Sequence, residues 1–250
     1  RPYYTKAANN IESYSLSPTG ARAVFGARGE ILTVPAEKGD IRNLTRTTGV
    51  AERYPAWSPD GQSIAYFSDE TGEYQLHVAP QNGMGEVKKY DLGMKSFFYS
   101  PTWSPDGKKI LFRDAAVTIH YIDLETKKVT KVDSDWYDVP DRDDMNPLWS
   151  PDSKWIVYNK LGRNFLRAVH VYSLADNKST QVSDGLSDQR YSAFDKGGRY
   201  IFFAASTNTS FSSGWLDMSS IDRIVNRNVY VVVLRKEDAS PLAPESDEEK

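Results

Sequence analysis

The side chains best suited to chemistry in this sequence are three histidines and a run of aspartates. His77, His120 and His170 each lie in a short apolar segment, and neutral imidazole is a common ligand of zinc. The aspartates could bind calcium through carboxylate oxygens: Asp133, Asp135, Asp138, Asp141, Asp143 and Asp144. However, Pro140 and Arg142 interrupt this run, and the regular spacing of a calcium-binding loop is absent.

The serines offer no recognisable nucleophile. The chain contains neither Gly-X-Ser-X-Gly nor Ser-X-X-Lys, and it has no cysteine and no glycine-rich phosphate loop. The most conspicuous serines recur in one five-residue pattern and are interpreted below as turn residues. We therefore expect no catalytic residue in this chain, and no metal or other cofactor.

That five-residue pattern is an internal repeat. Trp-Ser-Pro-Asp-Gly occurs at 57–61 and 103–107, Trp-Ser-Pro-Asp-Ser at 149–153, and weaker copies at 16–20 and 194–198. The second residue of each copy is called its anchor: Ser17, Ser58, Ser104, Ser150 and Asp195. The anchors are spaced by 41, 46, 46 and 45 residues, which is the period of a four-stranded propeller blade.

The residues around the anchors keep the same register. Eight positions after each anchor stands an aromatic residue: Phe25, Tyr66, Phe112, Tyr158 and Phe203. Ser-Pro-Asp-Gly is turn chemistry, because proline presets φ, aspartate bonds nearby backbone and glycine accepts a positive φ. Each copy therefore predicts a hairpin whose tryptophan packs between neighbouring blades.

The fold predicted from this repeat is all-β, a propeller with five four-stranded blades. The blades are expected at 11–53, 54–98, 99–144, 145–189 and 190–234. Third strands are expected at 31–34, 75–78, 118–122, 168–172 and 229–233, and fourth strands at 41–45, 87–90, 129–132 and 179–182. The last unit lacks a fourth strand, so segment 1–10 is a candidate closing strand. Residues 235–250 are interpreted as an acidic, proline-containing linker.

The repeat also decides between the interpretations of the histidines. All three occupy one position of the predicted third strand, and the other two blades place Thr33 and Tyr230 there. A position that accepts threonine or tyrosine indicates strand packing with a polar tip rather than metal ligation.

Two groups of residues are candidate binding positions. The first strands should lie nearest the propeller axis, which makes these eight residues candidates for lining a pore: Tyr54, Ala56, Ser100, Thr102, Asn146, Leu148, Tyr191 and Ala193. The last blade carries an insertion at 207–227, whose Trp215, Asp217 and Met218 form a candidate binding loop.

Composition restricts the partners. The net charge is −3 and the pI about 5.7, so no positive field attracts nucleic acid. No run of 18 apolar residues predicts a membrane span. We expect peptides or a protein as partners.

Several long stretches resemble the second propeller of bacterial tricorn-like serine proteases: 20–25, 28–39, 230–236 and 240–250. The shorter Trp-Ser-Pro-Asp-Gly pattern is similar to repeats shared with TolB propellers. The tricorn resemblance implies a seven-bladed propeller, of which five units are an open fragment unless they close as a ring of five. It also implies a parent peptidase, with a PDZ domain and a protease core outside this chain, to which the propeller channels or filters peptides. The compartment stays open between bacterial cytoplasm and periplasm.

Two other functions fit the repeat. One is a TolB-like propeller that docks a protein partner without any peptidase. The other is a stand-alone propeller lyase or hydrolase with a central metal, which the scattered histidines disfavour.

Overall fold

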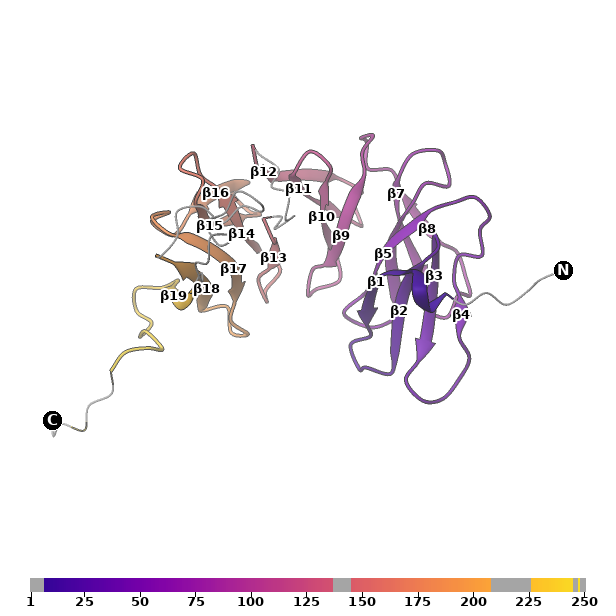
Figure 1. Cartoon of the computed structure of the whole chain (residues 1–250), viewed down its shortest axis with the longest axis horizontal. Helices are drawn as coiled ribbons and strands as arrows, with labels where there is room; N and C mark the ends of the chain where they lie inside the picture. The colour runs from indigo at the N-terminus through magenta and orange to yellow at the C-terminus, as the bar shows by residue number, and fades with distance from the viewer. Residues whose placement is uncertain (1–6, 137–144, 208–225, 245–246, 248–250) are drawn as a thin grey trace. The chain divides into compact units, whose positions relative to one another are not determined.

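Five antiparallel sheets make up the part of the chain that the computed structural model describes, residues 7–136, 145–207, 226–244 and 247. Each sheet is built from strands that are consecutive in the sequence (Figure 1). The chain divides into two compact units, 1–134 and 135–250. The first unit holds three sheets and the second holds two. No helix among the described residues is long and apolar enough to cross a membrane.

The first unit contains blades 1 to 3. Blade 1 consists of β1 (Ile11–Leu16), β2 (Arg22–Ala27), β3 (Glu30–Pro35) and β4 (Arg42–Asn43). Blade 2 consists of β5 (Glu52–Trp57), β6 (Ser63–Ser68), β7 (Gln75–Pro80) and β8 (Lys88–Tyr90). Blade 3 consists of β9 (Phe98–Trp103), β10 (Lys109–Asp114), β11 (Thr118–Asp123) and β12 (Val129–Ser134).

The second unit contains blades 4 and 5. Blade 4 consists of β13 (Leu148–Trp149), β14 (Trp155–Leu161), β15 (Arg167–Ser173) and β16 (Lys178–Gln181). Blade 5 has three strands, β17 (Asp188–Phe194), β18 (Tyr200–Ser206) and β19 (Asn228–Val233). The expected third and fourth strands therefore form, with shifts of at most two residues at their ends. Residues 8–10 form a short 3-10 helix, η1 (Ala8–Asn10), and 1–6 of the candidate closing strand lie outside the described residues.

The blades pack through their sheet faces, and the recurring tryptophan lies at these contacts as predicted. Trp57 of blade 2 is buried with Val24 and Ile31 of blade 1. Trp103 of blade 3 packs against a core that includes Val78 of blade 2, and its indole Nε1 donates a hydrogen bond of 3.1 Å to the Ala56 carbonyl. An indole therefore both fills the space between sheets and ties neighbouring first strands together.

One expectation about the third strands is wrong. The histidines do share a position, since His77, His120 and His170 pair with the aromatic residues Tyr66, Phe112 and Tyr158 on the adjacent strand. In blade 5 Tyr230 pairs with Phe203 in the same way. In blade 1, however, Phe25 pairs with Leu32, whereas Thr33 pairs with Val24. The tight turn at 28–29 shortens this hairpin, which places Leu32 in the histidine position.

Candidate functional site

The repeated serines are held inside the turns that join the first two strands of each blade. In blade 2 the Ser58 hydroxyl donates to Asp60 Oδ1 at 2.5 Å and accepts from the Ser63 backbone N–H at 2.9 Å. Ser104 with Asp106, and Ser150 with Asp152, repeat both contacts. Each hydroxyl thus serves the turn, which is the role predicted for these serines.

Blade 5 builds the same turn from one side chain. Asp195 Oδ1 accepts the backbone N–H groups of Arg199 and Tyr200, both at 2.7 Å, and its Oδ2 accepts that of Gly197 at 2.9 Å. Slight burial opposes ionisation, but these three hydrogen bonds outweigh it and lower the pKa of the Asp195 carboxyl. In blade 2 the hydrogen bond from Ser58 is the main cause of a lowered pKa of Asp60.

The first strands carry the residues proposed to line a pore. Strands β1 and β5 contact each other, as do β5 and β9, and in the second unit β13 contacts β17. This contact between first strands is expected where sheets fan out from a shared centre. Four residues at one repeat position, four before the anchor, have a positive φ: Tyr54 (54°), Ser100 (50°), Asn146 (40°) and Tyr191 (58°).

A positive φ is unfavourable for residues other than glycine, so its recurrence at this position shows that the fold imposes it. The pairing of β5 with β6, β9 with β10 and β17 with β18 is interrupted by a bulge at this point. Ser100, Asn146 and Tyr191 are exposed, whereas Tyr54 is half-buried. The predicted residues two positions before the anchor, namely Ala56, Thr102, Leu148 and Ala193, are all half-buried.

The edges of these first strands are poorly suited to pairing with a peptide backbone. A proline follows the positive-φ residue in three blades, at Pro55, Pro101 and Pro147. Proline has no N–H to donate, and a bulge breaks the even spacing of the groups that remain. Such edges resist the addition of another strand. These strands therefore suit contact with a peptide through their side chains rather than through their backbone.

In the first unit the first strands of blades 2 and 3 bring two tyrosine rings together. Tyr54 and Tyr99 meet edge to face across the contact between blades 2 and 3, with ring centroids 5.7 Å apart. The Arg113 guanidinium lies 5.1 Å from the centre of the Tyr99 ring. Tyrosine and arginine together provide flat surfaces that suit weak contacts with many peptide sequences.

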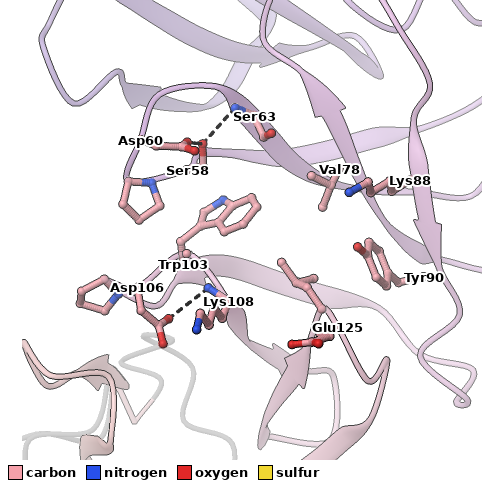
Figure 2. Close-up of a pocket in the computed structure, with 14 residues that line it drawn as sticks. Ser58, Asp60, Ser63, Val78, Lys88, Tyr90, Trp103, Asp106, Lys108 and Glu125 are labelled. Carbon is pink, nitrogen blue, oxygen red and sulfur yellow. Dashed lines mark hydrogen bonds between the residues drawn. The ribbon is translucent and has the colours of Figure 1, made fainter.

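Grooves lie between neighbouring blades beside the turns. The groove between blades 2 and 3 has a volume of about 630 Å³, and Figure 2 shows Trp103 between the two turns that flank it. Lys88 and Tyr90 of β8 line the groove from one side, and Glu125 lines it from the other. No local sequence pattern marks this groove, because its walls come from five separate segments of the chain.

The groove between blades 4 and 5 is larger, at about 850 Å³. Phe194 of blade 5 takes the position of Trp103, and Val182 takes that of Tyr90. At the lip, Leu234 and Arg235 replace Leu124 and Glu125 of the other groove. The correspondence follows from the backbone hydrogen bonds, because the Leu124 N–H donates to the Lys108 carbonyl and the Leu234 N–H donates to the equivalent Arg199 carbonyl. Only alignment by hydrogen-bond register makes this correspondence visible.

The three histidines have different surroundings. His77 is buried, and its Nε2 has no hydrogen-bond partner; burial first, and then the positive charge of Lys89, lower its pKa to about 4. His120 lies 3.0 Å from Asp114 through Nε2 and Oδ2. His170 stacks on Tyr158 with ring centroids 5.6 Å apart. Within the described residues no three histidine, aspartate or glutamate side chains gather as metal ligands would.

Some of the first strands that carry the pore-lining candidates contact each other, namely β5 and β9 in the first unit and β13 and β17 in the second. The candidate binding loop, Trp215, Asp217 and Met218, lies outside the described residues, as do Asp138, Asp141, Asp143 and Asp144 of the acidic run. Of that run, Asp133 and Asp135 are described. Asp133 Oδ1 accepts the Ser134 N–H at 2.8 Å, and Asp135 Oδ2 accepts the Leu161 N–H at 3.1 Å.

Sheets of four consecutive antiparallel strands, with the recurring turn and the tryptophan contacts, define this protein as a β-propeller. The sequence profile described as "Tricorn protease second beta propeller domain" matches residues 11–250. The chain therefore belongs to this family.

Known proteins agree with that assignment. The chain is 23% identical to Tricorn protease homolog 1 of Streptomyces coelicolor, over 97% of this chain and 23% of the homolog. It thus spans about a quarter of that relative's length. The crystal structure of the tricorn protease superposes with a TM-score of 0.73 at 18% identity, covering 96% of this chain and 23% of that one. A TolB structure from Agrobacterium tumefaciens gives a TM-score of 0.57 at 17% identity, covering 90% and 77%.

Proposed function

We propose that this chain is a non-catalytic propeller module that channels or filters peptides for a serine peptidase core lying outside the chain. The observation that carries this proposal is the match of residues 11–250 to the tricorn second propeller family. The turn serines support the non-catalytic part, because their hydroxyls are engaged by neighbouring aspartates and backbone N–H groups.

The first strands support a particular mode of contact. Their bulges and prolines disfavour strand addition, whereas exposed side chains such as Ser100 and Tyr191 are available to a passing chain. A channel that contacts peptides by side chains alone holds them weakly. Weak contact suits passage, because a peptide bound along a sheet edge would be slow to leave.

Photo-crosslinking tests this mode of contact. A benzophenone amino acid is introduced at Tyr54 or at Tyr191, and at Lys131 on β12 as a control on the opposite edge of a blade. With an extended casein-derived peptide we expect crosslinks at Tyr54 and Tyr191 and far fewer at Lys131. Equal labelling at all three positions would contradict the proposal.

Two further measurements test the peptidase assignment. Incubating the chain with casein should release no new fragments, and measurable turnover would overturn the non-catalytic role. Reading the gene beyond Lys250 distinguishes the proposal from a TolB-like interaction propeller. A PDZ segment followed by a peptidase core supports the proposal, and a stop codon supports the alternative.

A further inference from the structure

The groove between blades 4 and 5 combines apolar walls with space for a small ligand. Its volume of about 850 Å³ falls within the usual range for ligand pockets. The apolar part of its lining includes Trp155, Val171, Val182, Phe194 and Leu234. Trp155 and Leu234 remain 41% and 38% exposed although both are large apolar side chains. A ligand with apolar groups would therefore gain by covering them.

Charges of both signs line the same groove. Lys178 and Arg235 have no carboxylate partner among the described residues. Asp152 uses Oδ1 to accept the Ser150 hydroxyl at 2.6 Å, and Asp176 uses Oδ2 to accept that of Ser173 at 2.7 Å. Each of these exposed carboxylates keeps one oxygen that no other described residue binds. Two cations and two carboxylates together suit a ligand that itself carries both charges.

The equivalent groove between blades 2 and 3 also has charges of both signs, such as Lys88 and Glu125, but it differs at several lining positions. Its floor is filled by the larger indole of Trp103, and Glu125 stands where Arg235 stands in the second unit. Its rim has Ser63 at the position that Trp155 occupies in blade 4, since each residue donates its backbone N–H to the anchor hydroxyl. Compared with the groove between blades 2 and 3, the groove between blades 4 and 5 thus has a smaller floor residue, and a cation in place of Glu125.

We propose that the groove between blades 4 and 5 binds short peptides that have apolar side chains and free termini. Lys178 and Arg235 receive the terminal carboxylate, and Asp152 and Asp176 receive the terminal ammonium group, through charge-assisted hydrogen bonds. Phe194, Trp155 and Leu234 cover the side chains. The site lies beside the turns and not on the first strands, so its test is independent of the channel proposed above.

Calorimetric titration with trileucine tests the ligand class. We expect saturable binding to the unaltered chain, weakened about tenfold or more by N-acetylation and likewise by C-terminal amidation, because each modification removes one charged contact. Absence of binding, or equal affinity for all three peptides, would overturn the proposal.

Two variants place the site. Phe194→Trp introduces the residue that three other blades carry at this position, so it should preserve the fold while narrowing the groove and weakening binding at least tenfold. Arg235→Glu should weaken trileucine at least tenfold but leave amidated trileucine unchanged. The matched controls in the other groove, Trp103→Phe and Glu125→Ala, should leave the affinity unchanged. Unaltered binding by Phe194→Trp, with a normal melting transition, would show that the peptide binds elsewhere.

Discussion

The contact between blades 2 and 3 and the contact between blades 4 and 5 use the same backbone positions with opposite chemistry. In the first unit Phe67 packs on Phe98 with ring centroids 5.4 Å apart. In the second unit the equivalent residues are Asn159 and Gln189, and the Asn159 Nδ2 donates to the Gln189 carbonyl at 3.1 Å. All four residues are almost completely buried.

The buried side-chain amides of Asn159 and Gln189 both have hydrogen-bond partners. Asn159 Oδ1 accepts both the backbone N–H and the hydroxyl of Ser192, at 3.1 and 2.9 Å. Gln189 Oε1 accepts the Val169 N–H at 3.2 Å. The turns and the strand register of the repeat therefore determine which positions of two neighbouring blades meet. Either dispersion or hydrogen bonding can then stabilise the contact, provided that no buried group lacks a partner.

Among the substitutions that test this comparison, Phe67→Ala should cause the largest loss of stability. Phe67 is fully buried and contacts both Phe98 and Phe112, so its truncation leaves a cavity that costs about 4 kcal/mol of unfolding free energy. Urea unfolding followed by tryptophan fluorescence measures the loss. Truncation of Phe165 in the second unit, which is 39% exposed, serves as the control and should cost far less.

The buried His77 of blade 2 should make the stability of the protein depend on pH. Because His77 has a folded pKa near 4, against about 6.5 when unfolded, the folded state disfavours its protonation. Stability is thus lost as pH falls from about 6.5 towards 4, by up to roughly 3 kcal/mol. The raised pKa of the buried Glu52 acts in the opposite direction, since its protonated form is favoured by folding.

The variant His77→Leu isolates the histidine's share. Leucine occupies this position in blade 1, so the substitution suits the sheet. Unfolding free energies at pH 7.5 and pH 4.5 should differ less for His77→Leu than for the unaltered chain. An identical pH dependence in the two proteins would refute the buried, neutral state of His77.

Asn159→Ala tests the polar contact and should have a smaller effect than Phe67→Ala. Removing the amide leaves the Ser192 N–H and the Gln189 carbonyl without partners, which costs about 2 kcal/mol. Hydrogen exchange of the Ser192 amide should accelerate as well. If stability is unchanged and exchange stays slow, the amide network is not what joins blades 4 and 5.

Trp103→Phe should have the smallest effect. Phenylalanine keeps most of the apolar contact, as Phe194 shows in blade 5, but loses the hydrogen bond to the Ala56 carbonyl. The expected cost is about 1 kcal/mol, measured as a lower melting temperature. A cost as large as that of Phe67→Ala would mean that the indole, rather than the strand register, holds blades 2 and 3 together.

The elements that could be predicted from sequence are those encoded within a single blade. The turns at Ser58, Ser104 and Ser150 and the aromatic residue eight positions later depend on nearby residues, and the structure confirms them. The histidine position in blade 1 was mispredicted because the length of one turn, at 28–29, shifts the register by a residue.

Features between blades could not be predicted in this way. The pairing of Asn159 with Gln189 and the two grooves depend on which faces meet across tens of residues, and no local pattern marks those faces. The bulges in the first strands were also missed. The proline after Tyr54, Ser100 and Asn146 was a usable signal, because proline within a predicted strand indicates an edge or a bulge.

Each sheet is completed by a continuous stretch of chain before the next one begins. Most backbone pairings therefore join residues that are close in sequence, which gives a lower contact order than a sandwich of similar size and favours faster folding. Blade 1 can begin to form as soon as its own strands have left the ribosome. Its sheet then offers an apolar surface on which blade 2 assembles, so folding can proceed in the order of synthesis.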